Sequence, residues 1–389
     1  MAGNHTSVEM TLEDFNNIEI AKRTSAIVYL SVVMILGIPG NLLVIIVYFG
    51  SLWRRDGTHW MYIRALAVTD LLVCTVAIPF EIFQQTHQLT FDSEVGCKIF
   101  RAISVHLSLT SSLLLIAMSG NRLRLVCQPL NKQLTPNQGL VTIAITVGIA
   151  VLFCWPEGAL SGISLEKLDY NLTGYDCSFS DRYSMKDYGT IYSTLLLTVY
   201  LSCMVALVIM YSIVGLRLLE RAKYQNSNRT RYAISTTSVA TELTSCEHHS
   251  TNLIKNQSET LDEKSIAIKT IATPGTPKNN DQKKSNGNSK RASKMKTSKK
   301  VTRIAFVVSF CFILSYLPYI AVKLNASVVK GQFTETPLTK AIFPILARTF
   351  IINNIINPVI YGFLDPTFLK HCKMTIKYIL CMKSENYSL

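Results

Sequence analysis

The stretch Asn353-Asn354-Ile355-Ile356-Asn357-Pro358-Val359-Ile360-Tyr361 lies late in the last long apolar segment of the chain. Its three asparagines and its proline stand where a helix facing lipid would carry only aliphatic side chains. Proline removes a backbone donor and kinks a helix, and a buried amide costs free energy unless it finds a hydrogen-bond partner. We therefore expect this segment to face other protein and to change conformation.

The composition indicates a membrane protein with several spans. Of the 389 residues, 49% are hydrophobic and only 16% are charged, and the mean hydropathy is +0.26. A spanning helix needs about 20 apolar residues. Seven segments qualify, and they leave no room for a separate soluble catalytic domain: 26–49, 61–83, 98–123, 139–160, 189–218, 300–324 and 340–362. The predicted fold is an all-α bundle of seven transmembrane helices with a short cytoplasmic amphipathic helix after it.

Charge placement sets the predicted orientation. The formal net charge is +14, and the basic residues concentrate in segments that are cytoplasmic if the amino terminus is outside. The first 24 residues contain no apolar core of a cleavable signal peptide. The basic excess needs no nucleic acid to explain it, and the chain is predicted to lie in the plasma membrane. The predicted parts are an extracellular tail over 1–25, the bundle over 26–362 with a disordered third inner loop over 219–298, and the amphipathic helix with a short tail over 363–389.

Four side chains are predicted modification sites. Asn4 and Asn171 begin glycosylation sequons that fall outside the cell in this topology. Cys372 and Cys381 lie in the amphipathic stretch that should follow the inner membrane face. They are candidates for palmitoylation, with free surface thiols as the alternative.

An ordered set of positions across the spans carries a family resemblance: Asn41, Asp70, Cys97, Arg122, Cys177, Pro318 and Asn357-Pro358-Val359-Ile360-Tyr361. Together with seven spans and an outside amino terminus, this set resembles the rhodopsin-like (class A) family of G-protein-coupled receptors, and within it the neuropeptide-receptor group. The resemblance implies a receptor rather than an enzyme, which converts agonist binding into nucleotide exchange on a heterotrimeric G protein. It also implies a disulfide between Cys97 and Cys177, both on the oxidising side where a bridge persists.

The resemblance further implies a sodium pocket in the middle of the bundle. It maps onto Asp70, Ser111, Asn353 and Asn357, with Asn41 alongside. Each side chain offers oxygen, the donor that suits a hard cation, and an intramembrane carboxylate is itself a functional-site hypothesis. The alternative is a protonated, hydrogen-bonded Asp70. Apart from this allosteric ion, no cofactor is predicted.

Arg122, at the inner end of the third span, is implied to meet the G protein when the sixth span swings outward at the Pro318 kink. The acidic neighbour that usually restrains this arginine is replaced by Asn121. An amide cannot supply the charge-assisted hydrogen bond of a carboxylate. We therefore expect a weaker resting lock and raised basal signalling.

The seventh span is implied to take part in the same switch. Pro358 marks the kink that lets its inner end rotate, and Tyr361 would then move toward Tyr211 and Arg122. The chain departs from the family pattern at three other positions, where a tyrosine, a proline and a tryptophan are usual: Leu123, Cys203 and Tyr316.

The outer halves of the spans indicate the class of ligand. Ser104 stands where amine receptors carry an aspartate, and Ile351 stands where opsins carry the Schiff-base lysine, so neither chemistry is expected. The remaining mouth is polar and mixed in charge, which suits a peptide agonist. One alternative is a Glu81–Arg101 salt bridge, and another is snorkelling of the basic residues at the membrane rim. The residues predicted to bind the agonist are Glu81, Arg101, Ser104, Tyr319, Lys323 and Arg348.

Two other functions stay open at this point. One is a receptor of the same fold for a lipid or another non-peptide ligand, and the other is a transporter, which the lack of an internal repeat disfavours. His106 is alone within its span, so no catalytic constellation supports an enzyme. The predicted partners are an extracellular peptide agonist, a heterotrimeric G protein, arrestin, receptor kinases and membrane lipids.

Overall fold

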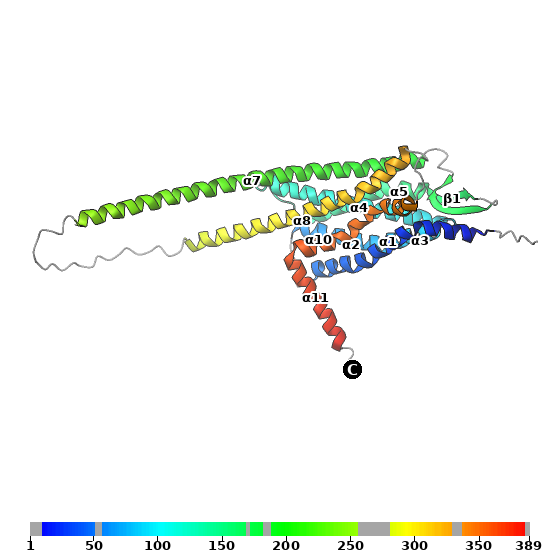
Figure 1. Cartoon of the computed structure of the whole chain (residues 1–389), viewed down its shortest axis with the longest axis horizontal. Helices are drawn as coiled ribbons and strands as arrows, with labels where there is room; N and C mark the ends of the chain where they lie inside the picture. Colours follow the sequence, from blue (N-terminus) through cyan, green and yellow to red (C-terminus); the bar gives the residue numbers. More distant parts are fainter. Residues whose placement is uncertain are drawn as a thin grey trace, which may run out of the picture. The chain divides into compact units, whose positions relative to one another are not determined.

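The computed structural model describes residues 10–50, 57–168, 172–181, 188–255, 281–328 and 337–385. Within these ranges six helical stretches are long and apolar enough to cross a membrane (Figure 1): α1 (Leu12–Phe49), Thr58–Thr86, α4 (Glu94–Cys127), α5 (Pro136–Leu160), Tyr188–Tyr224 and Lys300–Leu324. A further apolar segment in the same ranges, Thr349–Leu364, is shorter than a full span. The predicted all-α membrane bundle is therefore confirmed.

The first helix begins before the predicted span. α1 starts directly after Thr11, which forms a capping box with Asp14; the Thr11 amide donates to Asp14 Oδ2 over 2.8 Å. Its 38 residues make about 57 Å of helix, roughly twice the apolar thickness of a bilayer. Asn16 fixes this extension to the next span, because its Nδ2 donates to the Thr86 carbonyl over 3.0 Å. The predicted tail over 1–25 is therefore helical in its second half.

The second span is interrupted just past Asp70. It comprises α2 (Thr58–Leu72), the π-helical turn η2 (Val73–Ala77) and α3 (Ile78–Thr86). Pro79, in the first turn of α3, has no N–H to offer the carbonyl of Thr75 four residues earlier. The wider turn lies over this missing bond, and such turns recur at functional sites.

The seventh span is three pieces rather than one helix: α9 (Pro337–Leu346), the 3-10 turn η4 (Thr349–Ile352) and α10 (Asn353–Leu364). The break lies at Arg348, whose backbone N–H donates to the Ile345 carbonyl over 2.8 Å. The Arg348 Nη1 donates to the Pro344 carbonyl over 3.0 Å and so satisfies the acceptor that an α-helical bond would have used. The chain can therefore turn there within the bundle.

A buried carboxylate joins the seventh span to α11 (Pro366–Glu385). Asp365 is fully buried, and its Oδ1 accepts the backbone N–H groups of Thr367 and Phe368 over 3.0 and 3.1 Å. These bonds cap the helix. The same oxygen accepts Lys300 Nζ over 2.5 Å, so an ion pair ties the start of the sixth span to α11. α11 agrees with the predicted amphipathic helix.

The third inner loop, predicted to be disordered over 219–298, contains helix. α7 (Tyr188–Lys255) runs through its first part and α8 (Asp281–Val328) through its last part. Extending an existing helix avoids the unfavourable nucleation step, and the leucines, arginines and glutamate that follow the fifth span are good helix formers. The chain divides into two units: Met1–Ser212 with Lys299–Leu389, and Ile213–Ser298.

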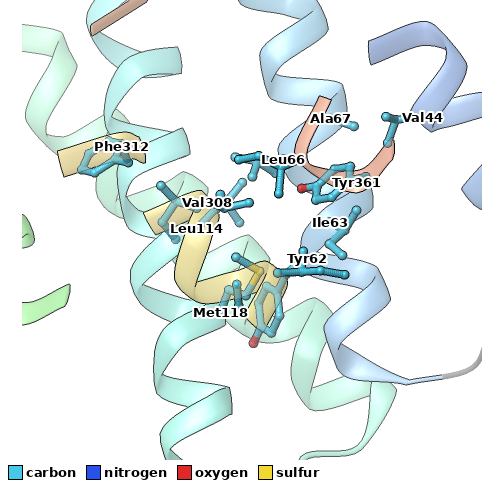
Figure 2. Close-up of a cluster of buried hydrophobic side chains, with 14 of the residues drawn as sticks. Val44, Tyr62, Ile63, Leu66, Ala67, Leu114, Met118, Val308, Phe312 and Tyr361 are labelled. Atoms are coloured by element: carbon cyan, nitrogen blue, oxygen red, sulfur yellow. The ribbon is translucent and has the colours of Figure 1, made fainter. Parts of the chain in front are cut away.

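The first unit packs around a buried apolar cluster (Figure 2). Lipid is as apolar as these side chains, so close packing rather than the hydrophobic effect holds the helices together. The cluster takes members from most of the helices of this unit, among them Val44 of α1, Leu66 of α2, Leu114 of α4, Phe312 of α8 and Tyr361 of α10.

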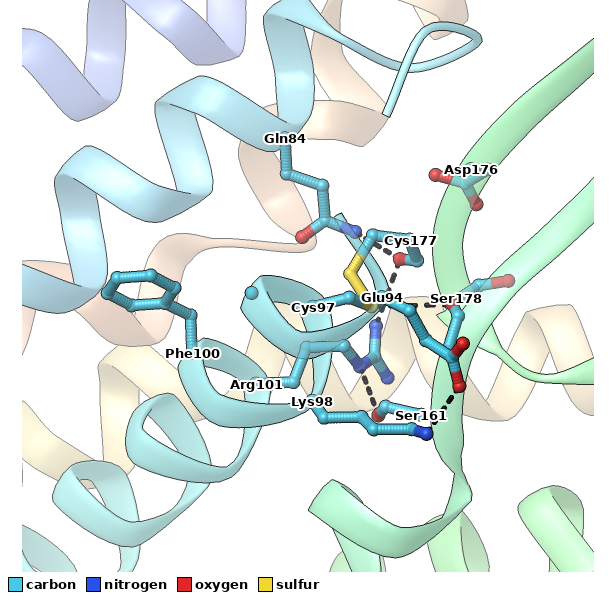
Figure 3. The surroundings of a disulfide bond; sticks show 12 residues. Gln84, Glu94, Cys97, Lys98, Phe100, Arg101, Ser161, Asp176, Cys177 and Ser178 are labelled. Carbon is cyan, nitrogen blue, oxygen red and sulfur yellow. Dashed lines mark hydrogen bonds and ion pairs between the residues drawn. A yellow bond between two sulfur atoms is a disulfide. The ribbon is translucent and has the colours of Figure 1, made fainter. Parts of the chain in front are cut away.

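A β-hairpin covers one end of the bundle. β1 (Ser161–Lys167) pairs antiparallel with β2 (Thr173–Phe179). Cys177 of β2 is bonded to Cys97 at the start of α4, with 5.6 Å between their Cα atoms (Figure 3), so the predicted disulfide is confirmed. We call this the hairpin end. Arg122 lies near the other end of α4, roughly 38 Å further along the helix.

Candidate functional site

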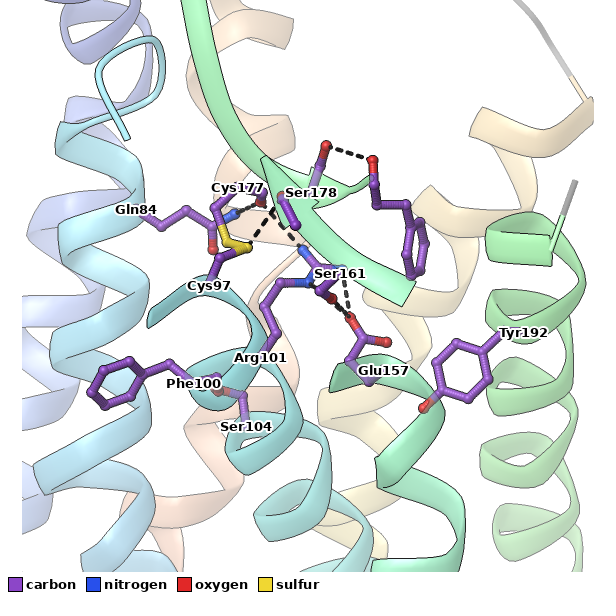
Figure 4. A network of polar contacts seen from close by, with 12 residues as sticks. Gln84, Cys97, Phe100, Arg101, Ser104, Glu157, Ser161, Cys177, Ser178 and Tyr192 are labelled. Atoms are coloured by element: carbon purple, nitrogen blue, oxygen red, sulfur yellow. Dashed lines mark hydrogen bonds and ion pairs between the residues drawn. A yellow bond between two sulfur atoms is a disulfide. The ribbon is translucent and has the colours of Figure 1, made fainter. Parts of the chain in front are cut away.

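Arg101 of α4 is the centre of a polar network beneath the hairpin (Figure 4). Its Nε donates to Glu157 Oε1 of α5 over 2.9 Å and to Ser161 Oγ of β1 over 2.8 Å. Its Nη1 reaches the Cys177 carbonyl at 3.5 Å, and Gln84 Nε2 of α3 donates to that same carbonyl over 2.6 Å. Glu157 is only 4% exposed. The network therefore fastens the hairpin to three helices.

The Glu81–Arg101 salt bridge considered from the sequence is not formed. Glu81 Oε1 instead accepts Arg348 Nε over 2.8 Å, while Arg101 turns toward Glu157. The reason is the break in the seventh span, which delivers Arg348 to α3. The last turn of α5 brings Glu157 to α4, where it forms the ion pair with the Arg101 guanidinium in place of Glu81.

Two cavities lie at the hairpin end. The deeper one has a volume of about 150 Å³ and reaches Ser111 and Asn353 in the middle of the bundle. The outer one has a volume of about 440 Å³ and is lined by charged groups of both signs. Five of the six predicted ligand-binding residues line a cavity, whereas Arg348 lines neither and reaches them through Glu81. Those five are Glu81, Arg101, Ser104, Tyr319 and Lys323.

Aromatic rings in mutual contact line the deeper cavity. The Tyr319 and Phe350 ring centroids lie 5.0 Å apart, and those of Tyr316 lie 5.4 Å from Phe350 and 5.3 Å from Tyr200. Tyr316, which replaces the family's tryptophan, also shares a hydrogen bond of 2.9 Å with Ser108 Oγ of α4. The rings therefore join α4, α7, α8 and η4 around one space.

The hairpin carries a titrating group of its own. Asp176 of β2 accepts Gln88 Nε2 over 2.9 Å. Burial and the neighbouring Glu166 carboxylate raise the pKa of Asp176 above its usual value, while Arg101 and Arg23 oppose that shift. The hairpin is thus electrostatically coupled to the network beneath it.

A buried polar cluster lies at the floor of the deeper cavity. Asp70 is fully buried; its Oδ2 accepts Asn357 Nδ2 over 2.7 Å and its Oδ1 accepts Ser111 Oγ over 3.4 Å. Ser111 and Asn353 line the same cavity. The structure therefore brings together the residues predicted for the ion site. Three amide oxygens there have no hydrogen-bond partner in the described structure: Oδ1 of Asn41, Asn353 and Asn357.

This donor set fits a hard monovalent cation. It offers one carboxylate, one hydroxyl and unpartnered amide oxygens, so all its ligands are oxygen atoms. An ionised Asp70 would balance one positive charge. Among the residues that the structure describes, no group of three or more His, Cys, Asp or Glu side chains could hold a metal.

Arg122 is 3% exposed, and its Nε has no hydrogen-bond partner. No ion pair in the described part of the chain includes it, and its neighbour Asn121 is buried with it. Ser309 Oγ donates to Tyr211 OH over 3.3 Å, and Tyr361 OH has no hydrogen-bond partner among the described residues. No described carboxylate restrains Arg122, while raised basal signalling stays a prediction.

The two predicted kinks lie inside helices. Pro318 stands within α8 and Pro358 within α10. Each removes one backbone hydrogen bond from its helix. Both helices can therefore bend at these prolines.

Sequence reasoning missed two residues of these networks and a third buried polar residue outside them. Asp365 had a readable signal, because an aspartate directly before a proline is typical of a helix start. Gln84 had none, since its partner is a backbone carbonyl in a distant hairpin. His59, buried with both ring nitrogens unpartnered, had none either.

Of the four predicted modification sites, the structure describes the side chain of Cys372. Cys372 is 4% exposed and packs in the apolar cluster, so its thiol is not a surface group open to acylation. The reason is the Asp365 cap, which sets the rotation of α11 against α1 and α10. Asn4, Asn171 and the side chain of Cys381 lie outside the described residues.

Comparison with known proteins agrees with this arrangement. The chain is 23% identical to cholecystokinin receptor type A of Homo sapiens, over 87% of this chain and 77% of that receptor. It is 25% identical to neuromedin-U receptor 2 of Rattus norvegicus over 48% of each chain. It is 21% identical to octopamine receptor beta-2R of Chilo suppressalis, over 97% of this chain and 89% of that receptor. Residues 40–361 match the family model described as 7 transmembrane receptor (rhodopsin family), so the chain belongs to the rhodopsin family of seven-transmembrane receptors.

Proposed function

We propose that this receptor binds an extracellular peptide agonist at the hairpin end and promotes nucleotide exchange on a heterotrimeric G protein at the Arg122 end. The observation that carries the proposal is the pair of adjoining cavities, with charges of both signs, beneath a hairpin tied by a disulfide. The basic excess of the inner segments supports an amino terminus outside the plasma membrane.

The cavities favour a peptide over a simple apolar ligand. The outer cavity is lined by Glu81, Arg101, Glu157 and Lys323, whereas a lipid would leave these groups desolvated without new partners. A peptide offers amides, charged groups and apolar side chains within one ligand. The similarity to receptors named for cholecystokinin and neuromedin-U supports the same reading.

The polar cluster is proposed as an allosteric sodium site. Asp70, Ser111, Asn353 and Asn357 would hold the ion, and the unpartnered amide oxygens would gain a cation to coordinate. An ion that binds one conformation better than another shifts the population toward the first. Sodium should therefore stabilise the compact resting arrangement and oppose agonist binding.

The other end is proposed as the coupling surface. Arg122 would be uncovered when the helices around it separate, and Leu130, 99% exposed in the connection between α4 and α5, offers an apolar contact for the G protein. The lysines of α11 suit anionic lipid headgroups. Arrestin and receptor kinases would use the same face.

The proposal is tested by screening a peptide library on cells that express the chain, with calcium and cyclic AMP read together. An active peptide should also bind an Arg122→Ala variant, which should give neither signal. A ligand-gated current without nucleotide exchange would overturn the receptor mechanism. Activation by non-peptide compounds alone, which the small deeper cavity makes the second candidate, would overturn the peptide assignment.

A further inference from the structure

The deeper cavity presents one charged side chain. Among its described lining residues, Glu81 is the only carboxylate, and no lysine or arginine lines it. Glu81 also lines the outer cavity, so this residue stands where the two meet. Arg348, the cation that holds it, lines neither cavity. A ligand that fills the deeper space therefore meets negative charge first.

The surroundings of Glu81 are aromatic. Tyr316, Tyr319 and Phe350 line the same cavity, with ring centroids 5.0 to 6.3 Å apart. The faces of such rings attract cations, and several rings around one space form the cage in which ammonium groups are bound. Tyr319 already carries one such contact, because Lys323 Nζ lies 5.9 Å from its ring centroid.

The size of the cavity limits what can enter. A volume of about 150 Å³ is that of a cavity known to hold one benzene ring. One aromatic ring or one short aliphatic chain therefore fits, together with a polar head placed at the mouth. Ser104 and Ser108 add hydroxyl groups to the wall for that head to contact.

We propose that the deeper cavity receives a cationic group of the agonist, an ammonium or a guanidinium, with Glu81 as its counter-ion and the aromatic rings around it. This inference rests on the proposed receptor function. An acidic group is disfavoured there, because it would have to approach Glu81 in order to reach Arg348.

The agonist cation replaces Arg348 on the Glu81 carboxylate. Arg348 has a second acceptor, the Pro344 carbonyl at 3.0 Å, which keeps its guanidinium bonded when Glu81 leaves. The exchange therefore leaves no buried guanidinium without a partner. It also releases the side-chain tie between α3 and the break in the seventh span, so occupancy of the cavity is transmitted to that span.

Two pairs of probes test the chemistry on the purified full-length receptor in detergent, without G protein. L-phenylalaninamide, which carries an ammonium, is compared with uncharged N-acetyl-L-phenylalaninamide. N-acetyl-L-argininamide, which carries a guanidinium, is compared with uncharged N-acetyl-L-citrullinamide. Binding is measured by the rise in melting temperature with probe concentration. At least one charged probe should stabilise the receptor and its uncharged partner should not, and equal stabilisation within both pairs would overturn the proposal.

Three variants locate the effect. Glu81→Gln should weaken binding of the charged probe by about tenfold to a hundredfold, the value of a charge-assisted hydrogen bond. Glu81→Asp should keep the preference for the charged probe over its uncharged partner. Arg348→Met should tighten binding of the charged probe by about twofold to fivefold, because a competing cation is removed. Glu166→Gln, an exposed carboxylate of β1, is the control and should bind as the parent does. Unchanged binding in Glu81→Gln would refute the counter-ion, whatever the cell-based screen shows about signalling.

Discussion

Replacement of Arg101 by methionine tests whether the network beneath the hairpin stabilises the receptor. Methionine keeps much of the apolar stem and removes the guanidinium. Glu157, 4% exposed, then retains from that network only Ser161 Oγ at 3.4 Å, and the Cys177 carbonyl retains only Gln84. A buried carboxylate without its cation is the main source of the expected loss.

The magnitude follows from burial. Removing one partner of a buried pair costs about 3–5 kcal/mol. The Arg101 side chain is 23% exposed, and solvent screening lowers the expected loss to about 2–3 kcal/mol. With about 2–4 °C per kcal/mol, the melting temperature should fall by roughly 5–10 °C. The assay is thermal unfolding of the purified receptor, followed by a thiol-reactive dye on the buried cysteines.

A double-mutant cycle decides the cause. Glu157→Gln removes the buried charge, so the double variant should be more stable than Arg101→Met alone by about 1 kcal/mol or more. Lys98→Met, which breaks an exposed pair with Glu94 on the same helix, should change stability by less than about 1 kcal/mol. Additive losses at Arg101 and Glu157 would refute the ion-pair argument.

Four further predictions concern the rest of the chain. Asp70→Asn should abolish any effect of sodium on agonist binding, and a variant as sensitive as the parent would contradict the ion site. Asn121→Asp should lower ligand-free nucleotide exchange by about tenfold, the value of one charge-assisted hydrogen bond; exchange no lower than the parent's would count against the weak resting lock. Lys300→Gln should cost about 2 kcal/mol in thermal unfolding, and a further Asp365→Asn change should recover part of it, because asparagine still caps α11. The pKa of Asp176 is raised in the fold, so its stabilising contribution is complete below its unfolded pKa and is lost as pH rises through the folded value. Asp176→Asn should therefore melt higher than the parent at pH 7, and the gap should close below about pH 4.

Much of the bundle was readable from the sequence because the bilayer imposes simple requirements. Apolar length placed the spans, and a carboxylate at membrane depth had to find polar partners, which Asp70 does in Asn357 and Ser111. The Cys97–Cys177 disulfide followed from the family resemblance and is confirmed.

The rest depended on backbone detail that apolar length does not encode. Arg348 meets Glu81 because the seventh span breaks and turns, and within that break its guanidinium also donates to the Pro344 carbonyl. The alternative of a Glu81–Arg101 salt bridge was wrong for a similar reason. The rotation of α4 turns Arg101 toward Glu157 of α5, and apolar length does not encode that rotation. The helical start at Thr11 was readable, because Thr11 and Asp14 have the spacing of a capping box, but the helix was expected to begin only with the apolar segment at residue 26.

The unpartnered amide oxygens of Asn41, Asn353 and Asn357 also have a practical consequence for preparing this receptor. A buried polar atom without a partner lowers the stability of the state that contains it by about 1–3 kcal/mol. Apolar replacement of Asn353 by leucine removes one such atom and should lengthen the lifetime of the protein in detergent. If the proposed ion site uses the same atoms, stability gained there should trade against signalling. The centre of the bundle is therefore the place to engineer a long-lived, signalling-silent form for structure determination.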